Sequence, residues 1–525
     1  MAEYNHSELV ERKVGCPLST TMEVKADNPT KSQRKVPAAG AVVSSKVPFF
    51  PRQQRGLWKI GRKFYDLGTF LDKHPGGRRI LELSRDRFGD STYAFEAHHA
   101  NQPRVRKMLE RYRAVGEPDA ADGPVLSDLA GFYGVLRARV DALLRTPAQR
   151  GPTAQCKALF FGTLAAFLAL HVALLAGGPR LYGWLAVPLA LASGVLGGFG
   201  HNFVHQPRYR RWAYASLDVI GFSSENWLRE HVLQHHMYTN SELDNHFRGT
   251  DPHLSPHPTE PRSAFNKIST LVWPVVLCFA VFGNWLNVAA SWAKNQETWR
   301  PTMFIQPALW AAHTYLWGTP GLVCCFLVSA VLGVWYFTVA LMNHNTDHTV
   351  QVTESEPACW GTHQLQTCSD IGVGLGFLPS WRYLWLNYHT VHHLFPATDM
   401  SRHPAIQQVL IRTAREFGVP YVCQDLAESL RQTITNFMYP IRGSPIRGGS
   451  EGGKGGNTGG KQLPKAKGGA EAGTNSALEW CVAVGLWAGK FVVASYVFPP
   501  AVTFFGWVGV AGVGISSIAL HRQVQ

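Results

Sequence analysis

Four apolar runs limit most strongly what this chain can fold into. They lie at about 157–178, 181–200, 268–289 and 320–343, and each is long enough to cross hydrocarbon as a helix, which takes roughly 20 residues. A shorter apolar stretch, 303–317, contains Pro307 and His313, so we expect it to be re-entrant or interfacial. Paired as two hairpins, the four runs predict an all-α multi-pass membrane domain with four transmembrane helices and additional cytosolic helices.

Charge and cysteine content narrow the class of protein. The net charge is +14, but the Lys and Arg residues are scattered. A nucleic-acid-binding surface needs a concentrated basic patch, so we expect no nucleic-acid partner and assign the charge to a cytosolic face beside anionic headgroups. The nine cysteines include no CxxC pair, which predicts reduced thiols and no disulfide framework.

The remaining boundaries follow from changes in composition. We expect a disordered tail at 1–48, a compact domain at 49–118, an amphipathic connector at 119–155, the membrane domain at 156–442, a Gly-rich linker at 443–476 and an apolar C-terminal tail at 477–525. The connector has helical amphipathic spacing, which favours a position at the membrane surface. Short alternating strands that pass into helices predict an α+β fold for the compact domain.

The compact domain holds a candidate haem site. His74 lies in the Pro-Gly-Gly turn of "FLDKHPGGRR", and His98 and His99 follow in "YAFEAHHAN". Two axial imidazoles can hold a haem iron between them, and the glycines let backbone approach a porphyrin closely. Such a six-coordinate iron carries electrons and has no open position for oxygen.

The stretch "KFYDLGTFLDKHPGG…GDSTYAFEAHH" resembles the cytochrome b5 family over some 60 residues. The resemblance implies a haem b cofactor, with His74 as one axial ligand. In desaturase-fused members the second ligand follows the motif Phe by four positions, which selects His99 over His98.

Three further histidine clusters lie beside the apolar runs. They are His201 and His205 in "HNFVHQ"; His231, His235 and His236 in "HVLQHHMYTN"; and His389, His392 and His393 in "NYHTVHHLFP". Spacings of three and four place imidazoles on one helical face. Eight histidines suit two metal ions, and imidazole suits Zn, Cu, Fe or Ni. Structural zinc usually takes cysteine, and a tethered electron carrier serves redox-active iron rather than zinc.

The motifs "HHMYTN…DP" and "LNYHTVHHLFP" resemble those of the membrane fatty acid desaturases, specifically the front-end members with a fused cytochrome b5. The resemblance covers about residues 56–440, and the layout is also similar to that of cytochrome b5-related proteins of insects. Through "NHN" at 343–345 it implies His344 as an additional iron ligand, with His348 a weaker candidate.

The resemblance also implies an activity and its partners. Two non-haem irons and O2 would desaturate a lipid acyl chain in an apolar tunnel between the spans. Electrons would come from NADH through a cytochrome b5 reductase, and no catalytic residue beyond the metal ligands is expected. Three positions depart from the front-end pattern: Asn202 and Val391 replace acidic residues, and His389 replaces Gln. The first two changes remove acids that could orient ligands.

The chemistry also constrains the topology. All iron ligands must meet, so the three clusters and the haem domain must share one side of the membrane. Four crossings satisfy this requirement. If 303–317 also crossed the membrane, the third cluster would emerge on the opposite side from the other two. The loop at 206–267 carries seven Lys or Arg residues and "GGPR" carries one, which places the sites in the cytosol, on a membrane that we expect to be the endoplasmic reticulum.

Two alternatives remain open at this stage. One is a lipid or sphingolipid hydroxylase with the same di-iron site, which only the mass of the product distinguishes. The other is a non-catalytic membrane haemoprotein whose metal site has decayed, which Asn202 and Val391 would favour.

Overall fold

A computed structural model describes residues 56–120, 123–241, 243–256, 261–294, 300–349 and 359–439. The predicted tail at 1–48, the linker at 443–476 and the apolar tail at 477–525 lie outside these residues. The chain forms two compact units, one of residues 1–150 with 354–425 and one of residues 151–353 with 426–525. The first unit therefore combines the N-terminal domain with a segment that the sequence analysis placed in the membrane domain.

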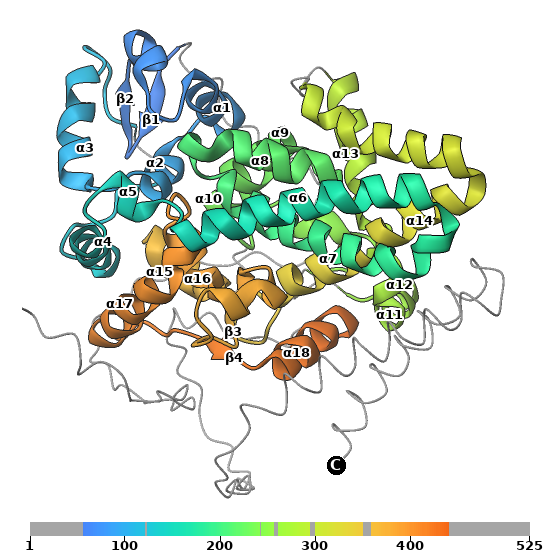
Figure 1. Ribbon diagram of the computed structural model, residues 1–525. Coiled ribbons are helices and arrows are strands. Elements are labelled where there is room, and N and C mark those ends of the chain that lie inside the picture. The colour runs from blue at the N-terminus through green and yellow to red at the C-terminus, as the bar shows by residue number, and fades with distance from the viewer. Residues whose placement is uncertain are drawn as a thin grey trace, which may run out of the picture. The chain divides into compact units, whose positions relative to one another are not determined.

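The N-terminal domain is built on a short hairpin surrounded by helices (Figure 1). Its elements are β1 (Trp58–Ile60), β2 (Lys63–Tyr65), η1 (Gly68–Lys73), α1 (Arg78–Phe88), α2 (Thr92–His98), α3 (Gln102–Leu109) and η2 (Glu110–Tyr112). The strands pair antiparallel with Trp58 opposite Tyr65. Both of these rings are buried with Leu71, Phe95 and Leu109 in one apolar core, so the predicted α+β fold is present.

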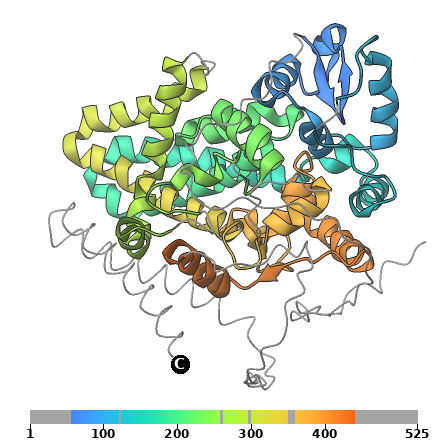
Figure 2. The ribbon, with the colours of Figure 1, turned by 180° about the vertical axis from the view of Figure 1, so that it is seen from behind.

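The rest of the first unit surrounds the helix α4 (Phe132–Leu143). The other elements are α5 (Pro147–Arg150), α15 (Trp360–Thr367), β3 (Asp370–Ile371), η8 (Leu378–Tyr383), η9 (Leu386–Tyr388), α16 (His389–Leu394), η10 (Met400–Arg402), α17 (His403–Glu416) and β4 (Cys423–Gln424). β3 and β4 pair in parallel. Both views show α4 beside α17 (Figures 1 and 2).

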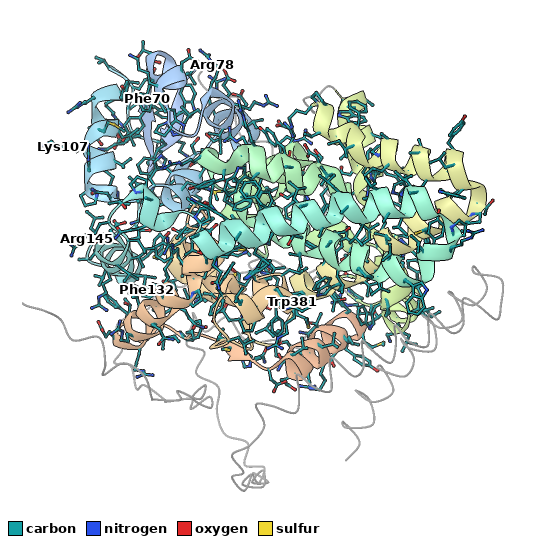
Figure 3. The ribbon with its side chains drawn as sticks, in the orientation of Figure 1. Phe70, Arg78, Lys107, Phe132, Arg145 and Trp381 are labelled. Atoms are coloured by element: carbon teal, nitrogen blue, oxygen red, sulfur yellow. The ribbon has the colours of Figure 1, made fainter. Side chains whose placement is uncertain are left out.

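The amphipathic connector was expected to lie on the membrane surface, but its apolar face packs on protein. Tyr133, Leu136 and Val140 of α4 are buried, and α4 contacts α15 and α17. The Phe132 ring lies 6.1 Å from that of Phe417 at the end of α17, and Figure 3 labels Phe132 on α4. The amphipathic spacing thus reflects intramolecular packing.

The secondary-structure elements in the described residues of the second unit are all helices. Its elements are α6 (Ala154–Gly177), α7 (Pro179–Phe203), η3 (Pro207–Tyr209), α8 (Arg210–Leu217), η4 (Asp218–Ile220), α9 (Ser224–Trp227), η5 (Leu228–His235, a π-helix), α10 (His236–Tyr238), η6 (Phe247–Thr250), α11 (Ala264–Leu271), α12 (Trp273–Cys278), α13 (Ala280–Ala293), η7 (Pro301–Phe304), α14 (Ile305–Met342) and α18 (Leu426–Met438).

Helices α6 and α7 form the first predicted hairpin. The Thr153 hydroxyl accepts a hydrogen bond from the Cys156 backbone N–H and so caps α6. Gly178 then reverses the chain with φ 58°, a conformation that glycine adopts without strain. The two helices lie side by side over their length (Figure 1).

Helix α14 contains a second reversal, at Gly318. Its φ of 58° and ψ of −141° match those of Gly178 closely. A Cβ on Gly321 would lie 2.1 Å from the carbonyl oxygen of His313, although eight residues of straight helix would separate them by about 12 Å. Residues 305–317 therefore fold back on 319–342. The apolar stretch 303–317 is therefore helical, and it forms a hairpin with the run that follows it, residues 319–342.

The predicted span at 268–289 is divided among three short helices, α11, α12 and α13. Pro274 lies in the first turn of α12, because proline suits the first turn of a helix and interrupts a helix interior. Among the described residues, three helices are long and apolar enough to cross a membrane: Ala154–Gly177, Pro179–Phe203 and Pro301–Met342, the last containing the Gly318 reversal. The prediction of four spans in two hairpins therefore stays a prediction.

Candidate metal centre and haem site

The first two histidine clusters meet inside the second unit. His201 lies in the last turn of α7 and His205 just beyond it, while His231 and His235 lie in η5 and His236 begins α10. All five side chains are buried. Because each comes from an element of the same unit, their mutual distances follow from one packed structure.

A π-helix determines which of these histidines pair. Spacing alone predicted His231 and His235 on one α-helical face, but η5 has i→i+5 geometry. It places Nε2 of His231 and Nε2 of His236 3.1 Å apart. Two nitrogens each about 2.1 Å from one ion lie about 3.0–3.4 Å apart for coordination angles between square and tetrahedral. His205 joins this pair, and one ring nitrogen from each of the three lies within 4.8 Å of the others.

His235 forms a second pair with His344, which follows α14. Their Nε2 atoms are 3.2 Å apart. Nδ1 of His235 lies 2.8 Å from the carboxylate of Asp244, and a carboxylate only accepts, so Nδ1 carries the proton and Nε2 is the metal-binding nitrogen. The Asn240 backbone N–H donates to the same carboxylate, and its side-chain amide donates to the His344 carbonyl.

Two more imidazoles adjoin these pairs. The His201 ring centroid lies 4.4 Å from that of His231. His246, which the sequence analysis did not select, lies 5.2 Å from His231 and 5.3 Å from His235. The sequence signal for His246 was its position eleven residues beyond His235, at the end of "SELDNH". By contrast, the weaker candidate His348 is exposed, whereas His344 is buried.

Burial favours the neutral form of His231 in this cluster. Burial lowers the pKa of His231 well below its ordinary value, and the neighbouring His201, His205 and His246 lower it further. A metal needs the neutral imidazole as its ligand. His231 is thus in the protonation state that a metal ligand requires.

The third cluster belongs to the first unit. Nε2 of His389 and Nε2 of His393 lie 3.1 Å apart on α16, the i, i+4 pairing that spacing predicted. Nδ1 of His393 lies 2.8 Å from Oε1 of Gln364 on α15, so this side chain also exposes Nε2 to a metal. The His392 ring lies 5.6 Å from that of His389, and all three histidines are buried.

A buried carboxyl supports the start of this helix. The Thr390 backbone N–H donates to Asp370 at 2.7 Å, and the Tyr421 hydroxyl donates to it at 2.6 Å. Burial raises the pKa of Asp370 to about 6. Sequence reasoning missed Asp370, Gln364 and Asp244, because each becomes a neighbour only through the fold.

The departures from the front-end pattern leave the surroundings well packed. The Asn202 side-chain oxygen accepts a hydrogen bond from the Gln206 amide at 2.7 Å. Val391 has no exposed surface. Both side chains are therefore buried beside their clusters.

The predicted haem ligands also face each other. The ring centroids of His74 and His99 are 5.9 Å apart, and two imidazoles that bind one metal from opposite sides, with bonds of about 2 Å, have centroids roughly 6 Å apart. Nδ1 of His99 bonds to the Phe95 carbonyl at 3.0 Å. A Cβ on Gly76 would lie 2.7 Å from the His74 ring, so the turn requires glycine there. The two rings suit a bis-imidazole haem.

Comparison with known proteins identifies both parts. Residues 179–425 match the fatty acid desaturase family, and residues 46–117 match the cytochrome b5-like haem/steroid binding domain. The chain is 28% identical over 381 residues to a cytochrome b5-related protein of Drosophila melanogaster, covering 69% of this chain and 83% of that protein.

Named desaturases are similar over comparable lengths. The Delta(5) fatty acid desaturase A of Dictyostelium discoideum is 24% identical over 445 residues, covering 74% of this chain and 90% of the relative. An acyl-lipid (8-3)-desaturase of Physcomitrium patens is 25% identical over 418 residues, covering 69% and 83%.

Proposed function

Because the chain belongs to the cytochrome b5-fused front-end fatty acid desaturases, we propose specific roles for its histidines. His74 and His99 hold haem b, and nine histidines hold two non-haem irons. The proposed iron ligands are His201, His205, His231, His235, His236, His344, His389, His392 and His393.

Geometry within each unit supports the iron assignment. In the second unit, ring nitrogens of His205, His231 and His236 lie close enough together to bind one ion. Those of His235 and His344 lie close enough together to bind another. Two or three imidazoles leave positions open on each ion. We propose that the third cluster, which has the same donor chemistry and a paired His389 and His393, supplies the remaining ligands.

The protein's own residues prepare this centre in three ways. Burial favours the neutral form of His231, Asp244 and Gln364 orient His235 and His393, and all the proposed iron ligands are buried. Iron bound there supplies oxygen activation, which consumes electrons that the haem delivers singly, in this proposal from NADH through a cytochrome b5 reductase.

The proposed substrate is a fatty acyl chain of a lipid, and the proposed co-substrate is O2. Relatives named Delta(5), (8-3) and (7-3) desaturases act on acyl chains or acyl lipids, as their names state. We propose that the acyl chain lies between the apolar helices, so that the depth of its insertion selects the bond.

We also propose that the sites face the cytosol at the endoplasmic reticulum. The first and third clusters must lie on one side, which requires an even number of crossings between them. In the proposed four-span arrangement, α6 and α7 are the first pair of spans, and residues 319–342 are one span of the second pair. The remaining crossing in this proposal is the apolar run at 268–289.

The observation that carries the proposal is the meeting of five buried imidazoles within the second unit, in a chain whose N-terminal domain holds the His74 and His99 ring centroids 5.9 Å apart. The test is lipid profiling after expression in a host without polyunsaturated lipids. We expect acyl chains lighter by two hydrogens. His236→Ala should abolish them, whereas His253→Ala, at an exposed histidine beside Phe265, should not.

Other outcomes separate the alternatives. Acyl chains heavier by one oxygen would identify a hydroxylase. Unchanged lipids from protein that contains haem but no non-haem iron would identify a non-catalytic haemoprotein whose metal site has decayed. Two zincs and no non-haem iron would refute the metal assignment.

A further inference from the structure

The haem-ligand helix is joined to the third histidine cluster by a buried charge. Glu96 lies on α2, three residues before His99, and its side chain has no exposed surface. Its carboxylate accepts hydrogen bonds from Arg106 at 3.1 Å, Arg137 at 2.9 Å and the Ser127 backbone N–H at 3.0 Å. A buried carboxylate persists only when paired in this way. Because Arg137 belongs to α4, the pairing fixes the haem domain to that helix.

From α4 the contacts continue to the cluster itself. The Arg137 guanidinium lies 4.1 Å above the Tyr133 ring, and the Tyr133 hydroxyl donates to the Leu394 carbonyl at 2.8 Å. Leu394 directly follows His393. The Tyr133 ring also lies 5.2 Å from the ring of Trp360, on the helix that supplies Gln364 to His393.

A second set of contacts runs parallel to the first. The Asn101 backbone N–H, just after the haem-ligand helix, donates to Asp141 of α4 at 2.9 Å. Asp141 accepts from Arg150 at 2.5 Å, and the Arg150 carbonyl accepts from the Asp399 N–H at 2.8 Å. Two independent hydrogen-bonded connections therefore cross from the haem domain through α4 to the segment around α16.

This arrangement differs from that of a carrier domain on a loose tether. Contacts between independently moving domains are polar and solvent-accessible. Here Glu96, Tyr133 and Arg137 are all buried, and a Cβ on Gly361 would lie 2.4 Å from the Tyr133 ring. The interface is packed as closely as a protein interior.

We infer that Glu96, Arg137 and Tyr133 are positioning residues that hold the haem at a fixed distance from the third cluster and so set the rate of electron transfer between them. In each transfer, ferrous haem loses one electron and iron at the cluster gains one, and no bond forms or breaks. The inference rests on the proposed haem and iron ligands. Tyr133 keeps its proton throughout, because burial raises the pKa of its hydroxyl.

The test uses full-length protein loaded with haem and iron, with Arg137→Met as the main variant. Arg139→Met is the matched control, because Arg139 lies on the same helix but bonds to Thr413 and Glu416. Hydrogen exchange reports the coupling without any turnover. Breaking a buried charge pair should increase exchange across α2 by about a hundredfold, and the control should change it less than about threefold.

Tyr133→Phe is the second variant, which keeps the ring and removes only the hydrogen bond to Leu394. It should raise exchange over residues 389–398 by about fivefold. Stopped-flow oxidation of the prereduced haem should slow in both variants, while the haem spectrum and midpoint potential stay unchanged. The control should transfer electrons at the wild-type rate.

The outcomes separate this inference from the proposed function. Wild-type protein without haem or non-haem iron would refute the proposed function. Loaded Arg137→Met and Tyr133→Phe proteins with wild-type exchange would overturn the positioning role. Increased exchange with an unchanged transfer rate would overturn the claim that the contact sets the rate.

Discussion

Replacing Asp244 by Asn tests whether this carboxylate orients a metal ligand. Asp244 has no exposed surface, and its carboxylate accepts from Nδ1 of His235 at 2.8 Å and from the Asn240 N–H at 3.0 Å. Asn has the same shape and keeps one acceptor oxygen, but it carries no charge. The change therefore removes a charge-assisted bond of about 1.5–3 kcal/mol.

This loss of binding free energy would affect the ion that His235 is proposed to bind. It corresponds to about a 10–100-fold lower iron affinity, the range measured when partners of ligating histidines are removed. The assay is non-haem iron content after dialysis against graded chelator. We expect Asp244→Asn to lose close to one of two irons at a chelator concentration that the wild-type protein withstands.

Asp218→Asn is the matched control. Asp218 is a buried aspartate of the same unit, but it accepts from the Ser224 N–H and the Thr302 hydroxyl. The control should change stability and leave iron retention unchanged. If Asp244→Asn held both irons as firmly as the wild-type protein, the hydrogen bond to His235 would not contribute to metal binding.

Two shorter predictions concern the first unit. His99→Ala should abolish the bis-imidazole absorption spectrum and His98→Ala should retain it; the reverse result would exchange the ligand assignment. The pKa of Asp370 is raised from 3.8 to about 6. Its contribution to the free energy of unfolding is therefore largest below pH 4, and roughly 3 kcal/mol of that contribution is lost as pH rises through 6. Asp370→Asn should remove this pH dependence of the local stability. The measurement is hydrogen exchange of the Thr390 amide, corrected for the intrinsic exchange rate at each pH. If the pH dependence persisted in the variant, Asp370 would not be its source.

Features that a short stretch of residues determines could be predicted from the sequence. The Pro-Gly-Gly turn at His74 and the second histidine pair indicated a haem site, and the His389–His393 spacing indicated one face of α16. The turn at Gly318 was signalled by "WGTPG", and the sequence analysis separated the runs on either side of it.

Other features depend on the tertiary structure. Nothing in the spacing of His231, His235 and His236 distinguishes α from π geometry, because neighbouring packing decides it. The roles of Glu96 and Asp244 arise from partners that the fold brings close. Pro274 argues against one uninterrupted helix over 268–289, but the prediction of a span there was based on the hydropathy of the run.

The π-helix at Leu228–His235 limits how this protein can be made more robust. An α-helix over the same residues would have better-aligned hydrogen bonds, but five α-helical residues turn the chain by about 140° beyond a full revolution. His236 would then point away from His231. Substitutions chosen for helix stability often trade against activity, and in these eight residues they would favour the competing α conformation. Thermostability engineering should therefore leave this segment unchanged and strengthen the protein elsewhere.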